Sequence, residues 1–310
     1  MNHGIIPKRQ QHWDIRAACN FIGGGTGTGL LLFAALALWG GGLPFTWTGL
    51  VGLACVGFGL SMVWLEIGRP WRAINVFFHP QTSWMTREGI VALPLFALAG
   101  LAVLLSLFGA RWGILPTSPL VRGLALAGAV TGLAFLYCQA RILLASKGIT
   151  AWSEPSFLPL LLVTGLTEGI GLLLVLSALL GASSPGTAIA GLVLAGVRYL
   201  TWWRYVRSLT VEHGAPEGTV AALKAAENGV LWMGHLAPAI LLLLGLSRPE
   251  SLPAMAVMSG LALAGGGWYL KGVVVLKAAR LQGFAIAHTP KRGRGTTRDV
   301  LRPGWHLPHQ

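Results

Sequence analysis

The sequence predicts an all-α, polytopic membrane protein built as a bundle of eight transmembrane helices. Hydrophobic residues make up 54% of the 310-residue chain and charged residues only 11%, against about 25% charged residues in an average soluble domain. The mean hydropathy of +0.66 leaves no room for a large soluble domain. Eight stretches are apolar and long enough to cross a hydrocarbon core, which takes about 20 residues of helix.

The expected spans follow one another along most of the chain. They lie roughly at 17–39, 46–66, 88–108, 122–145, 157–180, 186–207, 228–247 and 253–276. With their connections they form one transmembrane domain, residues 1–280. Residues 281–310 form a basic tail that lacks the apolar side chains to fold alone. We expect this tail to bind either anionic lipid or a partner subunit.

Basic residues are distributed unevenly between the connections. With both termini placed on the basic side, that side carries twenty of the 23 lysines and arginines, and the other side carries Arg111, Arg122 and Arg248. Cytoplasmic loops of membrane proteins show this excess, so both termini are expected in the cytoplasm. The same pattern accounts for the net charge of +13 without a nucleic-acid partner, which would call for one continuous basic face.

The sequence offers few ligands for a metal centre. Cys19, Cys55 and Cys138 are too few and too far apart for an iron–sulfur cluster, which takes about four thiolates. A haem with two histidine ligands needs two histidines inside the bundle, and only His235 lies clearly inside a span. We therefore predict neither a haem nor an iron–sulfur cluster in this chain.

Residues 23–29 read GGGTGTG and lie in the first apolar span. A phosphate-binding loop would need a strand before the glycines and, in its commonest form, a Lys-Ser/Thr pair after them. Both are missing here. Small residues four apart on a membrane helix favour close helix–helix packing instead.

Ionisable side chains within the spans gather in the inner half of the predicted bundle. Because a charge in the bilayer is costly, each is a candidate for function. Glu168 and His235 lie deepest, and each either handles protons or a ligand, or is simply paired by hydrogen bonds. Glu66 and Glu88 lie at the inner ends of the second and third spans. The basic side chains of these spans are expected to extend to the headgroups; they are Arg141, Arg198 and Lys271.

Two stretches resemble a known family. The connection 65–88 reads LEIGRPWRAINVFFHPQTSWMTRE, and residues 271–293 read KGVVVLKAARLQGFAIAHTPKRG. Both look like the membrane anchors of the dimethyl sulfoxide reductase family (DmsC-like), within the wider NrfD/polysulfide-reductase group. The second stretch is most similar to anchors of phenylacetyl-CoA:acceptor oxidoreductases, and sulfite dehydrogenase-type anchors are also similar. The motifs cover about 45 residues, and the eight-span layout matches the whole chain.

The resemblance implies a three-subunit oxidoreductase in the cytoplasmic membrane of a bacterium or archaeon. A molybdopterin catalytic subunit and a four-cluster iron–sulfur subunit would sit on this anchor, which itself would hold no metal. The anchor would exchange electrons between the cluster subunit and menaquinone or ubiquinone. Because the family motifs and the basic connections share one face, the catalytic arm is expected in the cytoplasm.

The resemblance also implies a role at a quinone site for two residues of this sequence. Glu88, in the SWMTRE piece, matches the acidic position tied to quinol binding, and Glu66 matches the position before IGRP, where many relatives have histidine. Seven further residues are candidates because they lie close to these two or deep in the predicted spans. They are Asn20, Arg69, His79, Trp84, Arg87, Glu168 and His235.

Two other functions are compatible with these residues. Eight spans with a buried glutamate and histidine also suit a proton-coupled secondary transporter, although the sequence shows no convincing inverted repeat between its halves. A passive structural anchor without a quinone site is the second alternative. Copurification with a molybdenum subunit would distinguish a quinone-reactive anchor from a transporter. Binding of a quinone analogue would distinguish it from a passive anchor.

Overall fold

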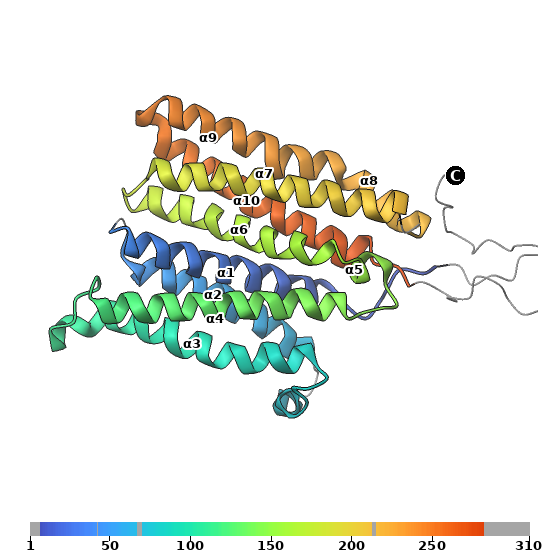
Figure 1. Ribbon diagram of the computed structural model, residues 1–310, viewed down its shortest axis with the longest axis horizontal. Helices are drawn as coiled ribbons and strands as arrows, with labels where there is room; N and C mark the ends of the chain where they lie inside the picture. The colour runs from blue at the N-terminus through green and yellow to red at the C-terminus, as the bar shows by residue number, and fades with distance from the viewer. Residues whose placement is uncertain (1–6, 42, 67–69, 213–214, 282–310) are drawn as a thin grey trace, which may run out of the picture.

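The computed structural model describes residues 7–41, 43–66, 70–212 and 215–281, and these residues form an all-α bundle (Figure 1). The prediction of an all-α membrane protein is confirmed. The long helices of the first half are α1 Ile15–Trp39, α2 Phe45–Glu66, α3 Trp84–Phe108 and α4 Pro119–Leu144. Those of the second half are α6 Phe157–Leu179, α7 Pro185–Arg207, α8 Glu217–Leu231, α9 Ala237–Ser247 and α10 Leu252–Gly272.

Short elements join or continue these helices. They are η1 Pro70–Phe78, η2 Gly109–Trp112, α5 Thr150–Ser153, η3 Ser208–Glu212, η4 Trp232–Leu236, η5 Pro249–Ser251 and η6 Val273–Lys277. The π-helical η4 connects α8 to α9, so that Glu217–Ser247 crosses the bundle as one rod. This rod starts eleven residues before the predicted span 228–247 because its first turns, outside the apolar stretch, are also helical.

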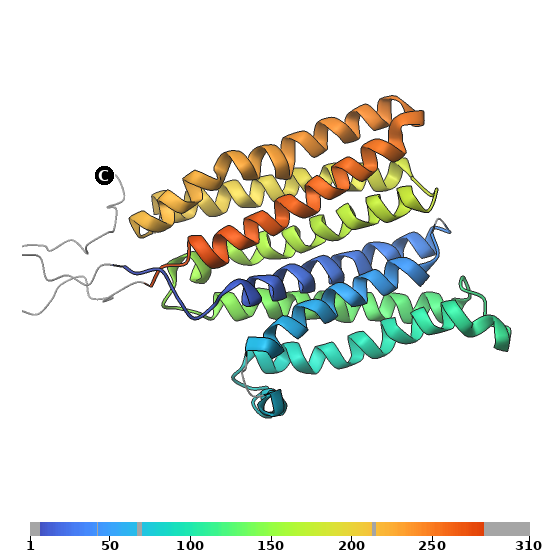
Figure 2. The same cartoon turned by 180° about the vertical axis from the view of Figure 1, so that it is seen from behind.

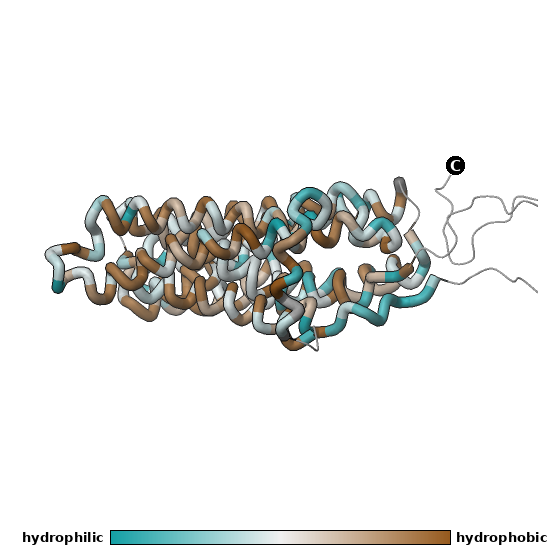
Figure 3. Tube along the Cα trace, turned by 90° about the horizontal axis from the view of Figure 1, so that it is seen from below, coloured by the Kyte–Doolittle hydropathy of each residue, from teal (hydrophilic) through white to brown (hydrophobic). Residues whose placement is uncertain are grey.

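Seven helices of the described chain are long and apolar enough to cross a membrane. The predicted span at 186–207 is a full helix, α7, but it is not among the seven; it is less apolar and carries three arginines, Arg198, Arg204 and Arg207. The tube in Figure 3 is hydrophobic along most of its length and most hydrophilic at the end where the described chain begins and ends. We refer to that end as the inner end.

Helices α1 and α6 lie at the centre of the bundle. Helix α1 packs against α2, α4 and α6, and α6 also packs against α7 and α10. The views from both sides agree with this order (Figures 1 and 2). Most of α1 is therefore buried, whereas α2 and α3 expose much of their apolar surface.

The glycines of GGGTGTG let α1 approach its neighbours closely. A Cβ at Gly23 or Gly27 would collide with the backbone of α2, and a Cβ at Gly29 would collide with the backbone of α6 at Gly165. The predicted role in helix packing is confirmed. The two glycines between them, Gly24 and Gly25, serve another purpose, because they face polar side chains.

The two ends of the described chain meet at the inner end. The Gln10 N–H donates to the Ala279 carbonyl (3.0 Å), and the Leu281 N–H donates to the Lys8 carbonyl (2.8 Å). Asp14 then caps α1 by accepting a hydrogen bond from the Arg16 N–H (2.8 Å). The Arg16 side chain also donates to the Asp14 carboxylate, which holds the pKa of Asp14 below its ordinary value. These contacts fix where α1 starts.

Candidate functional site

A cavity of about 220 Å³ lies at the inner end, among α1, α2, α3 and α4. Three of the predicted site residues, Asn20, Glu66 and Glu88, line it together. The other lining residues are Trp13, Ala17, Phe21, Val63, Met85 and Ile142. Its wall is thus mostly apolar with a few polar groups, the usual make-up of a site for a small organic ligand. We call it the inner cavity.

The positions where α1, α2 and α3 begin or end place the polar residues of the inner cavity at the same depth in the bundle. Ser83 caps α3 by accepting from the Thr86 N–H (3.3 Å), so Glu88 lies in the second turn of α3. Asn20 likewise lies in the second turn of α1, and Glu66 is the last residue of α2. Because α1 and α3 start at the end where α2 finishes, all three residues face the same cavity.

Glu88 and Asn20 are buried and incompletely hydrogen-bonded. They are 6% and 4% exposed, and in the described part of the chain Glu88 Oε1 and Asn20 Oδ1 have no hydrogen-bond partner. A buried polar atom without a partner is destabilising, so such atoms call for an explanation. Both oxygens are inaccessible to solvent although their residues line the inner cavity, so a polar ligand there would meet them only when the side chains turn.

Gln139 on α4 contacts the polar residues of the inner cavity, although it does not itself line the cavity. Its Nε2 donates to the Asn20 backbone carbonyl (3.2 Å), and it neighbours the Glu88 carboxyl. A Cβ at Gly24 would collide with the Gln139 amide, so the glycine makes room for this side chain. Gln139 is not among the predicted site residues, although an amide within the apolar run of residues 122–145 is a signal for it.

Aromatic rings also line the inner cavity. Trp13 stacks on Phe21 with ring centroids 5.7 Å apart and an interplanar angle of 11°. Trp13 also contacts Trp152, with centroids 5.1 Å apart. Trp13 and Phe21 line the cavity, and a flat ring could pack against them. Trp13 precedes the first span, so the hydropathy pattern gave no reason to select it.

The predicted candidates Trp84, Arg87 and His79 of the 65–88 connection do not line the inner cavity. Trp84 lies between two arginines, with its ring centroid 4.2 Å from Arg87 Cζ and 4.7 Å from Arg141 Cζ. The Arg87 guanidinium donates to the Pro80 carbonyl at 2.7 Å. His79 is exposed. Arg69 lies outside the described residues.

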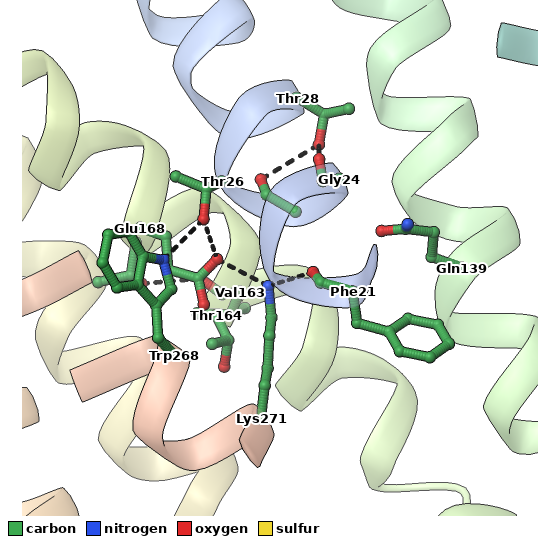
Figure 4. A network of polar contacts seen from close by, with 12 residues as sticks. Phe21, Gly24, Thr26, Thr28, Gln139, Val163, Thr164, Glu168, Trp268 and Lys271 are labelled. Carbon is green, nitrogen blue, oxygen red and sulfur yellow. Dashed lines mark hydrogen bonds and ion pairs between the residues drawn. The ribbon is translucent and has the colours of Figure 1, made fainter. Parts of the chain in front are cut away.

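Glu168 belongs to a second, separate polar group inside the bundle (Figure 4). It lies equally far from both ends of α6, about 16 Å from each at 1.5 Å per residue. Its Oε2 accepts from Thr26 Oγ1 (2.8 Å) and from Lys271 Nζ (2.7 Å). Lys271 Nζ also donates to the Phe21 carbonyl (2.8 Å), and Trp268 Nε1 donates to Thr26 Oγ1 (2.9 Å).

The expectation that Lys271 and Arg198 extend to the headgroups is wrong. Lys271 is 1% and Arg198 0% exposed, because each finds acceptors inside the protein and has no need of water. Arg198 donates to the Leu263 carbonyl (2.9 Å), to the Gly234 carbonyl and to His235 Nε2 (3.3 Å).

A proline explains why a carbonyl is free to accept from Arg198. Pro238 has no N–H, so the Gly234 carbonyl, four residues earlier, lacks its usual helical donor. The chain forms a π-turn there, Trp232–Leu236, which contains His235. His235 Nδ1 lies 2.8 Å from the Val230 carbonyl, so both ring nitrogens have partners within the bundle. The predicted candidates Glu168 and His235 thus belong to internal networks and do not line the inner cavity.

The described residues contain no group of three or more histidine, cysteine, aspartate or glutamate side chains that could hold a metal ion. The site is therefore best described as an apolar inner cavity with three polar groups, in a multi-pass membrane bundle.

The chain belongs to the NrfD family, because the family model described as polysulphide reductase, NrfD, matches residues 7–281. Proteins of this family are membrane subunits that generally anchor redox enzyme complexes. The family is associated with quinone interaction and generally partners with iron–sulfur and molybdopterin subunits. No curated protein sequence matches the chain significantly.

Proposed function

We propose that this chain is the quinone-reactive anchor of a three-subunit molybdenum and iron–sulfur oxidoreductase, and that the inner cavity is its quinone site. The observation that carries the proposal is that two residues lining that cavity, Glu88 and Asn20, each hold a buried oxygen without a hydrogen-bond partner. Family membership supports an association with quinone and with redox partners.

The dimensions of the cavity suit a ring rather than a whole lipid-like quinone. Pockets that enclose drug-sized ligands usually measure about 300–1,000 Å³, and the inner cavity measures about 220 Å³. A quinone ring would occupy the cavity beside Trp13 and Phe21, and its isoprenoid tail would remain in the lipid. Menaquinone and ubiquinone share this ring chemistry, and both remain candidates.

The polar groups have roles that follow from their chemistry. A quinone takes up two electrons and two protons when it becomes a quinol, and it releases them in the reverse direction. The Glu88 carboxyl can donate or accept one proton at Oε1, the general acid–base role of a carboxyl within hydrogen-bond reach. The Asn20 amide would orient the ring by hydrogen bonding to one of its oxygens. Glu66, half-buried at the end of α2, would exchange protons with the cytoplasm.

The partners would dock at the inner end. The inner cavity lies there, so an iron–sulfur subunit bound at that end would be closest to the ring. The excess of lysine and arginine at this end favours a cytoplasmic orientation. The catalytic subunit would then act on a cytoplasmic substrate, and the chain would lie in the cytoplasmic membrane of a bacterium or archaeon.

The transporter alternative finds less support. A transport site would centre on Glu168 and His235, but Glu168 Oε2 is bonded to Lys271 and both ring nitrogens of His235 have partners. Of the polar side-chain atoms of these two residues, only Glu168 Oε1 has no hydrogen-bond partner among the described residues. A passive anchor differs from the proposed function in that quinone-linked turnover would not depend on Glu88 or Asn20.

The test is a mild-detergent purification of the tagged chain from its host, followed by metal analysis, protein identification and quinone-linked assays. We expect molybdenum or tungsten with non-haem iron in stoichiometric partners. Glu88→Gln should then lower quinone-linked turnover by about 100-fold or more, the usual contribution of a general acid–base group. Turnover of the same complex with a soluble artificial electron carrier should not change.

Glu227→Gln is the matched control, because Glu227 is an exposed glutamate at the same end of the bundle. A chain that purifies alone and without metal would exclude the proposal. An intact complex in which Glu88→Gln and Asn20→Leu both keep full quinone-linked turnover would point to a passive anchor.

A further inference from the structure

The short helix η1 exposes an unusual amount of apolar surface. Trp71 is 88% exposed, Ile74 61% and Phe78 62%, and Phe77 is 39% exposed. In a 3₁₀-helix, residues three apart lie above one another, so Trp71, Ile74 and Phe77 form one stripe. An exposed aromatic and aliphatic stripe of this kind on a short helix marks a binding surface rather than an ordinary loop.

The orientation of η1 differs from that of the spans. In Figures 1 and 2 the long helices run across the picture, whereas η1, in dark teal beside the start of α3, is seen end-on. Its axis therefore runs across the bundle axis and along the plane of the membrane. It is held there by α2 and α3; Val76 and Phe77 pack at Gly89 of α3, where an added Cβ would lie 3.4 Å from each.

The exposed stripe continues the lipid-facing surface of the bundle. At the end of α2, Trp64 and Leu65 are 59% and 63% exposed. Near the start of α3, Ile90 and Leu93 are exposed as well. These side chains belong to membrane spans, and η1 extends their apolar surface sideways at the inner end. Tryptophan is enriched at the level of the headgroups, and tryptophan and phenylalanine are typical of the apolar face of an interfacial helix.

We propose that η1 is an interfacial helix whose Trp71, Ile74, Phe77 and Phe78 insert into the boundary between lipid headgroups and acyl chains. Helices of this type lie in the plane of the membrane with their apolar face about 5–10 Å into the boundary. The partner of this surface is thus the lipid itself. This inference is independent of the quinone proposal, because it rests on exposure and orientation alone.

The test is photo-crosslinking in native membranes that contain the full complex. A benzophenone amino acid replaces Trp71 in one variant and Phe78 in another, and mass spectrometry identifies the adducts. Benzophenone reacts with the C–H bonds of acyl chains as well as with protein. Gln81 is the matched control position, since it is exposed and follows η1 in the same connection. Substitution of exposed side chains should leave folding intact, and the yield of membrane-inserted complex verifies this.

We expect lipid adducts at positions 71 and 78 in at least about five-fold higher yield than at position 81, as an apolar face inserted in the interface predicts. Adducts with a partner subunit at positions 71 and 78 would overturn the proposal and assign the stripe to protein docking. Lipid yields equal to those at position 81 would also overturn it, because η1 would then lie in water.

Discussion

Lys271 on α10 and Glu168 on α6 form an ion pair in the middle of the bundle, with Lys271 Nζ 2.7 Å from Glu168 Oε2 and side-chain exposures of 1% and 0%. Both charges are surrounded by apolar helices, and Thr26 and the Phe21 carbonyl satisfy further hydrogen bonds. The pair thereby joins α1, α6 and α10 at one point. A buried pair of this kind is costly to form, but breaking it by removing one partner costs still more.

The first prediction concerns this ion pair. Glu168→Gln or Lys271→Met should each destabilise the protein by about 3–5 kcal/mol, because each leaves one buried charge without its counterpart. The double variant Glu168→Gln/Lys271→Met should lose less than either single variant, since no unpaired charge remains. Thermal unfolding of the purified protein in detergent measures the three effects. Additive losses in the double variant would contradict the prediction.

The second prediction concerns two glycines on α10. A Cβ at Gly267 would collide with the Glu168 carboxyl, whereas a Cβ at Gly265 would meet nothing within 4 Å. Gly267→Ala should therefore displace Glu168 from Lys271 and lower the melting temperature. Gly265→Ala serves as the matched control and should be neutral or slightly stabilising, because alanine favours the helix by about 1 kcal/mol over glycine. Equal melting temperatures of the Gly267→Ala and Gly265→Ala variants would exclude a steric clash between residue 267 and Glu168.

The third prediction concerns Arg198. Its planar guanidinium donates to two carbonyls and to His235 at once, and a lysine ammonium cannot reproduce this fork. Arg198→Lys should cost about 1–3 kcal/mol, the cost of a buried polar group left without its partner. The exposed Arg204 is on the same helix, and Arg204→Lys should stay within about 0.5 kcal/mol of wild type. The free energies of unfolding of the two variants, measured in the same detergent and buffer, test this difference.

The fourth prediction concerns Trp84. Arg87 and Arg141 both lie within 5 Å of the centre of its ring, and each cation–π contact contributes about 0.5–1 kcal/mol. Trp84→Leu should thus lower the free energy of unfolding by about 1–2 kcal/mol. Trp47→Leu is the control, because Trp47 is 55% exposed on α2 and no arginine of the described residues lies over its ring. A loss as large in Trp47→Leu would show that the effect of Trp84→Leu does not depend on the two arginines.

Sequence alone determined the class of this protein. Apolar stretches of about 20 residues can be stable in lipid only as helices, because every backbone group must find a partner within its own segment. The positions of lysine and arginine can also be read directly from the sequence. Their excess in alternate connections distinguishes one end of the bundle from the other. Motifs at residues 65–88 and 271–293 indicated the family that the comparison shows.

Only the tertiary structure decided which polar residues meet. Asn20, Glu66 and Glu88 were selected from the sequence and line one cavity, but Gln139 and Trp13 were missed because their roles depend on neighbours from other helices. Lys271 and Arg198 were expected to extend to the headgroups, because hydropathy reports the polarity of a residue and gives no information about its neighbours in the fold. Whether a charge turns to water or stays inside depends on acceptors that are distant in sequence, here Glu168 and the Gly234 carbonyl. Helix packing supplies those acceptors, and no local pattern encodes them.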